Sequence, residues 1–88
     1  MSTVDRATVT TWLIERVAFY VEREPADIDP TKHLAMYGMD SLYALGLAGD
    51  VEDEYGIDLD AAVVWDHPTI EAIAAYVEKT HPSAGVPD

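Results

Sequence analysis

The segment Gly38-Met39-Asp40-Ser41-Leu42 holds the residues best placed for chemistry, because its serine opens a helical pattern directly after an aspartate. The pattern predicts a helix from Ser41 to about Tyr55, with Asp40 as its N-cap and Gly56 as its C-terminal cap. A helix start presents unpaired backbone N–H groups and the positive end of the helix dipole. A phosphate group on Ser41 would lie close to these groups, which favour an anion. The alternative interpretation is that Ser41 only helps to cap a helix.

The elements that position this segment are all helical in the sequence pattern. A first helix is predicted from about residue 4 to residue 23, ending before Pro25, and a turn-rich loop follows up to Asp40. A short helical turn is expected over residues 60–64, and a last helix follows Pro68-Thr69. We therefore expect an all-α fold, a small bundle of three main helices plus one short helix, with a long loop between the first and second. A loop of that length in a small domain is often functional.

Buried stripes of apolar residues support these helices. Trp12 and Phe19, seven residues apart, fall outside the stripe of the first helix, so they either cover the edge of the core or form an exposed contact surface. The residues expected to face the core are Val9, Leu13, Val17 and Val21 in the first helix, Ala44, Leu47, Ala48, Val51 and Tyr55 in the second, and Ile70, Ile73, Ala74 and Val77 in the last.

Several segments together resemble one known family. Gly38-Met39-Asp40-Ser41-Leu42 resembles the attachment motif of acyl carrier proteins, and residues 34–38 look like the loop that precedes it in polyketide synthase carriers. Residues 65–70, Trp-Asp-His-Pro-Thr-Ile, resemble the entry to the last helix of those carriers. Trp12-Leu13 and Ile57-Asp58-Leu59 also lie at the expected separations, so the resemblance covers roughly residues 9 to 78.

The resemblance implies a carrier that is not itself an enzyme. Its implied cofactor is 4′-phosphopantetheine, covalently attached to Ser41 from coenzyme A by a phosphopantetheinyl transferase, with Asp40 and Leu42 flanking the site. The arm ends in a thiol that carries acyl groups as thioesters, which agrees with the absence of cysteine from the chain. The other implied partners are an acyl-loading enzyme and a ketosynthase or condensation enzyme, in polyketide or lipopeptide biosynthesis.

The second helix departs from the usual pattern of modular polyketide synthase carriers at Gly46, Ala48 and Gly49. Residues 47–53 look instead like carriers that receive their acyl group from fatty acyl-AMP ligases. The closest alternative is a peptidyl or aryl carrier of a non-ribosomal peptide pathway, which uses the same arm.

The charge distribution predicts which surfaces meet partners. The net charge is −12, and no Lys or Arg occurs between Lys32 and Lys79, so nucleic acid and anionic membranes are not expected partners. Acidic residues crowd residues 50–60 and serve either solubility or docking onto basic grooves.

Helical spacing places Leu42, Leu45, Gly46, Gly49 and Asp53 on the solvent side of the second helix, with Glu52 also toward solvent. The two glycines either have no function or leave a flat strip on which a partner packs closely. Interior glycines are unfavourable in a helix, so replacing both with alanine is expected to stabilise the fold in either case. The residues predicted to bind partners are Met39, Leu42, Leu45, Gly46, Gly49, Glu52 and Asp53.

Two other functions fit the sequence poorly. A serine hydrolase needs a base beside its nucleophile, but Ser41 is not in a Gly-x-Ser-x-Gly motif and the histidines are scattered at His33, His67 and His81. A calcium-binding loop starting at Asp50 would need glycine at its sixth position and glutamate at its twelfth, where this chain has Tyr55 and Ala61.

The remaining expectations concern the extent and location of the domain. We expect a carrier domain over residues 1–80 and a disordered tail over residues 81–88, where prolines and a glycine are frequent. The N-terminus lacks the basic and apolar stretches of a signal peptide and no apolar run is long enough to cross a bilayer, so a cytoplasmic protein is expected. Met1 and the short tail suggest a discrete protein, which we expect to be a monomer.

Overall fold

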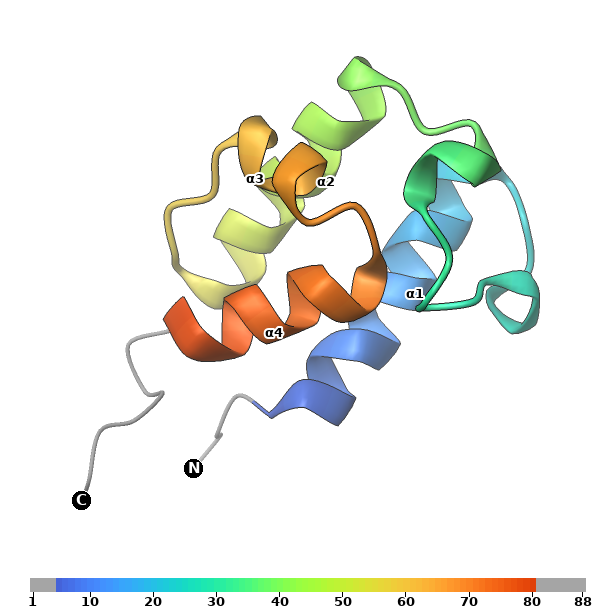
Figure 1. The fold of residues 1–88 in the computed structure, drawn as a ribbon. Coiled ribbons are helices and arrows are strands. Elements are labelled where there is room, and N and C mark those ends of the chain that lie inside the picture. The colour runs from blue at the N-terminus through green and yellow to red at the C-terminus, as the bar shows by residue number, and fades with distance from the viewer. Residues whose placement is uncertain (1–4, 81–88) are drawn as a thin grey trace.

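The computed structural model describes residues 5–80, which fold as a small helical bundle (Figure 1). The elements in chain order are α1 (Arg6–Val21), the 3₁₀ turns η1 (Pro25–Asp27) and η2 (Leu34–Tyr37), α2 (Ser41–Tyr55), α3 (Ala61–Asp66) and α4 (Ile70–Thr80). No strand occurs within residues 5–80, and the predicted all-α class is confirmed. The predicted tail, residues 81–88, lies outside the described residues.

Three aspartates fix where helices begin. The side chain of Asp5 accepts a hydrogen bond from the Thr8 amide at the start of α1, and Asp60 caps α3 in the same way through the Ala62 amide. Asp40 is the N-cap of α2, and Gly56 ends that helix in the left-handed region at φ 66°, as the sequence predicts. The first helix ends differently, because Glu22 rather than a glycine adopts the left-handed cap at φ 59°.

The core is built from the predicted stripes of α1, α2 and α4, together with Val64 of α3 and the loop residues Ile28 and Leu34. Val21 and Tyr55, at the margins of the stripes, are half-buried rather than buried. The largest fully buried side chains are Val9, Leu13 and Val17 from α1, Leu47 and Val51 from α2, and Ile70, Ile73 and Val77 from α4.

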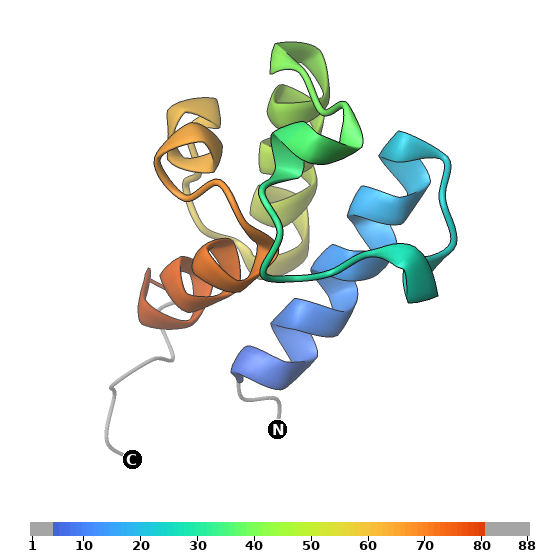
Figure 2. The same cartoon turned by 45° about the vertical axis from the view of Figure 1, so that its right-hand side comes forward.

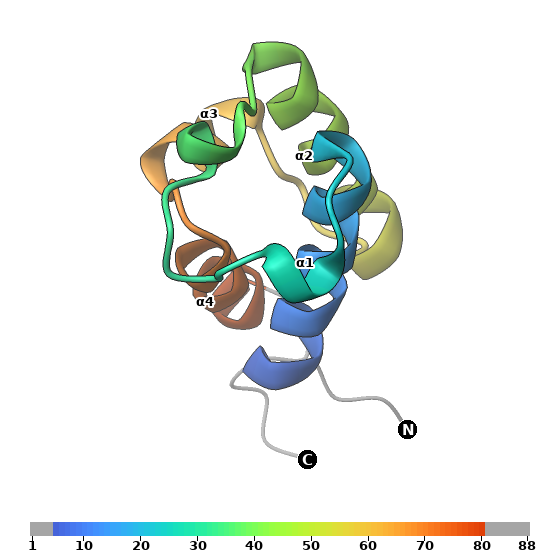
Figure 3. The ribbon, with the colours of Figure 1, turned by 90° about the vertical axis from the view of Figure 1, so that its right-hand side faces the viewer.

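The helices pack in two closely contacting pairs, α1 with α4 and α2 with α3, as Figure 1 and Figure 2 show. The contact between α1 and α2 is smaller. In these views and in Figure 3, the start of α2 lies at the opposite end of the bundle from the start of α1. The serine that opens α2 therefore stands at one tip of the molecule.

The long loop between α1 and α2 is tied down along its length. The hydroxyl of Tyr37 accepts a hydrogen bond from the Asp29 amide (2.7 Å). The Leu34 amide donates to the Pro68 carbonyl (2.8 Å), and the Glu71 amide to the carbonyl of residue 30 (2.9 Å). The loop is therefore fixed to the entry of α4 before it reaches the candidate site.

Candidate functional site

The start of α2 is held from both sides of Ser41. Gly38 closes η2 in the left-handed region at φ 85°, a conformation that favours glycine and turns the chain toward the helix. At Asp40, Oδ1 accepts a hydrogen bond from the Tyr43 amide (3.1 Å) and the backbone carbonyl accepts one from the Ala44 amide (2.9 Å). The predicted capping role of Asp40 is confirmed, and α2 begins at Ser41.

Met39 is buried, whereas a residue that binds a partner has to be exposed. Only 5% of it is exposed, and it packs in the apolar core between the loop and α2. The prediction that Met39 contributes to a docking surface is therefore wrong for this fold, because its side chain anchors the residues just before Ser41 from inside.

The local chemistry fits a covalently held phosphodiester. By their position, the first amides of α2 have no partner within the helix, and Ser41 opens that helix. The Asp40 carboxylate is already engaged by the Tyr43 amide. The other amides of the first turn, and not the carboxylate, would hold the phosphate end of the arm, whose thiol supplies the thioester chemistry when the arm is attached.

The outer face of α2 carries several of the predicted partner-binding residues. Leu42 is 73% exposed and Leu45 is 61% exposed, although both are large apolar side chains. A β-carbon at Gly49 would meet no atom within 4 Å, and Asp53 is exposed. These four residues lie on the solvent side, as the helical spacing predicts.

Gly46 does not belong to that open strip. A β-carbon built there would lie 2.9 Å from the hydroxyl oxygen of Tyr20 and 3.2 Å from its Cζ, closer than such contacts allow. The missing side chain at Gly46 makes room for a residue of α1, so Gly46 does not leave a flat surface open to a partner. For the same reason we now expect alanine at this position to destabilise the fold rather than to stabilise it.

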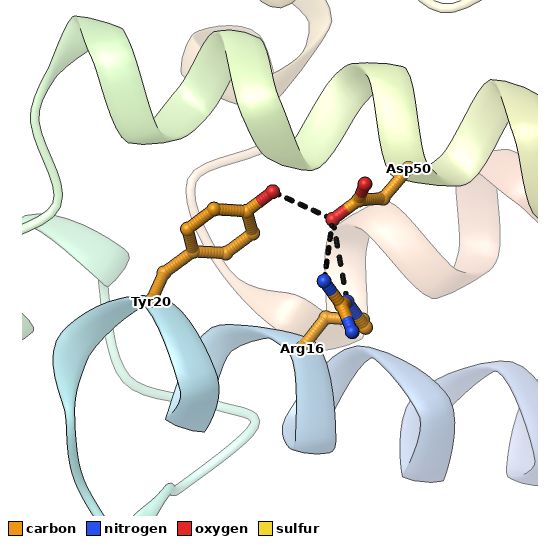
Figure 4. Close-up of polar contacts among 3 residues, drawn as sticks. All are labelled: Arg16, Tyr20 and Asp50. Carbon is orange, nitrogen blue, oxygen red and sulfur yellow. Dashed lines mark hydrogen bonds and ion pairs between the residues drawn. The ribbon is translucent and has the colours of Figure 1, made fainter.

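Tyr20 reaches Gly46 as part of a polar cluster between α1 and α2, which we call the clamp and which Figure 4 shows. The Tyr20 hydroxyl donates to Oδ2 of Asp50 (2.6 Å), and Arg16 donates to the same oxygen from Nη2 (3.1 Å) and Nε (3.3 Å). Charge-assisted bonds of this kind are stronger than neutral ones. The clamp joins two helices that otherwise have only a small contact.

The clamp shifts the protonation of its own members. Burial raises the pKa of the Tyr20 phenol above its ordinary value, and the bond to Asp50 raises it further. Partial burial lowers the pKa of Arg16, but its bonds to Asp50 and Tyr20 outweigh this and leave the pKa above its ordinary value. The clamp was not predicted from the sequence, where its only signals are an Arg–Tyr pair four residues apart and a glycine in α2.

Glu52 has a structural contact that was not predicted from the sequence. Its Oε2 accepts a hydrogen bond from the Leu59 amide (2.7 Å) in the loop between α2 and α3. The residue is exposed, as predicted, but its carboxylate also fixes this loop.

A small apolar cavity of about 180 Å³ lies beside the start of α2. Its walls come from η2, α2 and α3 and include Leu34, Met39, Ala44, Val64 and Trp65. Met39 and Ala44 flank Ser41 in the chain, so the cavity opens close to the candidate attachment site and can shelter an apolar group.

The histidines and acidic residues form no second site within residues 5–80. His67 contacts the Val63 carbonyl through Nδ1 (3.1 Å) at the end of α3, a structural contact. In this described part of the chain, no three His, Asp or Glu side chains converge in a way that could hold a metal ion. None of its helices is long and apolar enough to cross a membrane.

Comparisons with known proteins agree with this geometry. Residues 11–77 match the family model described as the phosphopantetheine attachment site. A phenolphthiocerol/phthiocerol polyketide synthase of Mycobacterium tuberculosis is 35% identical over 72 residues, 82% of this chain and 4% of the relative. The phenolphthiocerol synthesis polyketide synthase Pks15/1 of Mycobacterium marinum is 40% identical over 60 residues, 68% of this chain and 3% of the relative. The chain thus spans only a small part of the synthases it matches.

Solved structures of carriers have the same fold. A free-standing peptidyl carrier protein of Acinetobacter baumannii is 37% identical with a TM-score of 0.82, over 85% of this chain and 94% of that one. The acyl carrier protein LipD of Actinoplanes friuliensis is 34% identical with a TM-score of 0.73, over 96% of this chain and 98% of that one.

The fold and the family match define a carrier domain. The chain belongs to the phosphopantetheine attachment-site family, and its relatives include carrier domains of polyketide synthases. As a carrier domain of this family, it holds 4′-phosphopantetheine covalently.

Proposed function

We propose that Ser41 is the residue that carries the arm. The observation that carries this proposal is its place as the first residue of α2, directly after the Asp40 cap, at one tip of the bundle. An anion attached there lies beside the amides and the dipole of a 15-residue helix. The Gly38 turn and buried Met39 support the same assignment, because they hold the backbone before Ser41 in place.

Intact-mass analysis tests this assignment. Incubation of the apo protein with coenzyme A and a broad-specificity phosphopantetheinyl transferase is expected to add the mass of one arm. Ser41→Ala is expected to abolish the addition while the helical circular dichroism stays unchanged. Modification of the alanine variant at Ser2 or Ser83 would refute the assignment to Ser41.

The proposed cargo is an acyl group of a polyketide or lipopeptide pathway, loaded by a fatty acyl-AMP ligase or an acyltransferase and passed to a ketosynthase or condensation enzyme. The polyketide synthase relatives support the pathway, and the apolar cavity beside Ser41 supports an apolar cargo. Incubating the holo protein with adenylating ligases and fatty acids of different lengths, then measuring the mass of the product, identifies the loading enzyme.

The second candidate is a peptidyl carrier, because the peptidyl carrier protein of Acinetobacter baumannii is 37% identical to this chain. Loading by an amino-acid-activating adenylation enzyme, with no loading by acyl-AMP ligases, would favour this candidate. The proposed setting is a cytoplasmic, monomeric protein, and sedimentation of the purified chain tests the monomer.

The outer face of α2 is the proposed docking surface for these enzymes. Leu42 and Leu45 supply exposed apolar surface, Gly49 leaves space for close approach, and Asp53 adds charge for a basic partner. Glu52 adds to the same negative charge, although its carboxylate also fixes the loop to α3.

A further inference from the structure

Phe19, on the outer side of α1, remains outside the functions proposed so far. Its side chain is 68% exposed, and two neighbours hold it. The Arg16 guanidinium carbon lies 5.1 Å from its ring centroid, and the Tyr20 ring meets it edge-on at 5.6 Å. Both neighbours are bound to Asp50 in the clamp (Figure 4). The clamp therefore fixes the surroundings of this exposed phenylalanine.

This phenylalanine is connected to the start of α2 by aromatic contacts. The centroid of the Tyr20 ring lies 5.8 Å from that of Tyr43, which follows Ser41 by two residues. We call Phe19, Tyr20 and Tyr43 the aromatic ledge. It extends from α1 to the start of α2, where Leu42, the neighbour of Tyr43 in the chain, is also exposed.

The charge around the ledge restricts what can cover it. Glu15 is exposed and lies one turn before Phe19 on α1, and the exposed Glu22 caps the end of this helix three residues after Phe19. A second copy of the chain, also with a net charge of −12, would be repelled. The complementary partner presents an apolar pocket with basic residues around it.

Resting on the proposed attachment at Ser41, we infer that the aromatic ledge is a docking surface for the phosphopantetheinyl transferase, with Phe19 as its anchor. This enzyme has to bring coenzyme A to Ser41 itself, so its footprint is centred there. A standard interface covers about 800 Å² of each partner, which corresponds to a circle of about 16 Å radius. An interface of this size centred near Ser41 includes the aromatic ledge, whose neighbouring ring centroids are 5.6 and 5.8 Å apart.

Steady-state kinetics of arm attachment test the inference, with the full-length apo protein as varied substrate of a purified broad-specificity transferase. Phe19→Ala is expected to raise KM about five- to twentyfold and to change kcat less than twofold, because binding is lost and not chemistry. Phe19→Leu keeps an apolar anchor and is expected to recover most of the loss. Thr11→Ala, an exposed change two turns away on the same helix, is the matched control and is expected to leave KM unchanged.

The outcomes separate this inference from the proposed function. Equal KM values for the wild type and Phe19→Ala would show that the aromatic ledge does not bind the transferase, while attachment at Ser41 would stand. The same conclusion would follow if Thr11→Ala raised KM as much as Phe19→Ala. An unmodified wild type would overturn both. Circular dichroism and thermal unfolding check that Phe19→Ala stays folded. A dimer of the wild type that Phe19→Ala abolishes in sedimentation would assign the ledge to self-association instead and overturn the inference.

Discussion

Two glycines three residues apart in α2 have opposite roles. The space beside Gly49 is open, whereas the space beside Gly46 is filled by the Tyr20 hydroxyl. Helix propensity treats the two positions alike, because it depends on the backbone of the helix itself and not on what packs against it. The difference arises only when α1 and α2 are placed together.

Gly49→Ala is expected to raise the free energy of unfolding by about 0.5–1 kcal/mol, because alanine restricts the unfolded chain and meets no neighbour in the fold. Urea unfolding followed by circular dichroism measures the change. A loss of stability at this position would mean that α2 has a neighbour there that the fold does not show.

Gly46→Ala is expected to lower the free energy of unfolding by about 1–2 kcal/mol. The gain in helix propensity is outweighed when Tyr20 is pushed from its bond to the charged Asp50, a bond of a class that contributes about 1.5–3 kcal/mol. The same substitution in a Tyr20→Phe background is expected to cost less, because the closest atom is gone. Equal costs in the two backgrounds would contradict this account.

Individual residues near the site could be predicted from sequence only where their role is local. Asp40 caps a helix through an amide three residues away, so its position in the sequence was sufficient to predict it. Met39 and Gly46 were misplaced because their neighbours come from other elements. Helical spacing places a residue on a face but does not say which faces are covered.

At the scale of the elements, the ends of α2 and the start of α3 could be predicted because caps are local signals. The clamp could not, since Asp50 is 30 residues from Tyr20 and 34 from Arg16. In the sequence, Asp50 only adds to an acidic stretch. In the fold, it is the acceptor that joins α1 to the helix bearing the candidate serine.

The clamp predicts how stability depends on alkaline pH. Burial and the bond to Asp50 raise the pKa of Tyr20 in the folded state, so folding favours the protonated phenol. This contribution is complete below the unfolded pKa of about 10 and is lost as the pH rises through the folded pKa. The free energy of unfolding is therefore expected to fall as the pH rises above about 10, and to fall less in Tyr20→Phe.

Urea unfolding at a series of pH values measures this difference. Burial also raises the pKa of Tyr55, which adds the same trend to both proteins and so cancels in the comparison. Parallel pH profiles for the wild type and Tyr20→Phe would show that folding does not change the pKa of the Tyr20 hydroxyl.

At the scale of the whole molecule, the fold class followed from apolar spacing, because each stripe requires a partner and the stripes close into one core. The pairing of α1 with α4 and of α2 with α3 could not be predicted, since the stripes do not specify their partners. The backbone bonds that fix the long loop to the entry of α4 could not be predicted either, because they join residues far apart in the sequence.

The distribution of charge over the molecule leads to the last prediction. Asp53 lies on the exposed face of α2, whereas the neighbouring Glu52 also holds a loop, so Asp53 is the better site for charge reversal. Asp53→Lys is expected to lower kcat/KM for arm attachment severalfold by slowing association, with little change in stability.

Glu71→Lys on α4 changes the net charge equally and is the control. The wild-type rate is expected to fall as the salt concentration rises toward about 1 M, because the Debye length there is only about 3 Å and charges on the two proteins no longer attract each other. At that salt concentration, Asp53→Lys and the wild type are expected to react at the same rate. Equal effects of the two reversals would mean that total charge, and not a docking face on α2, governs the encounter.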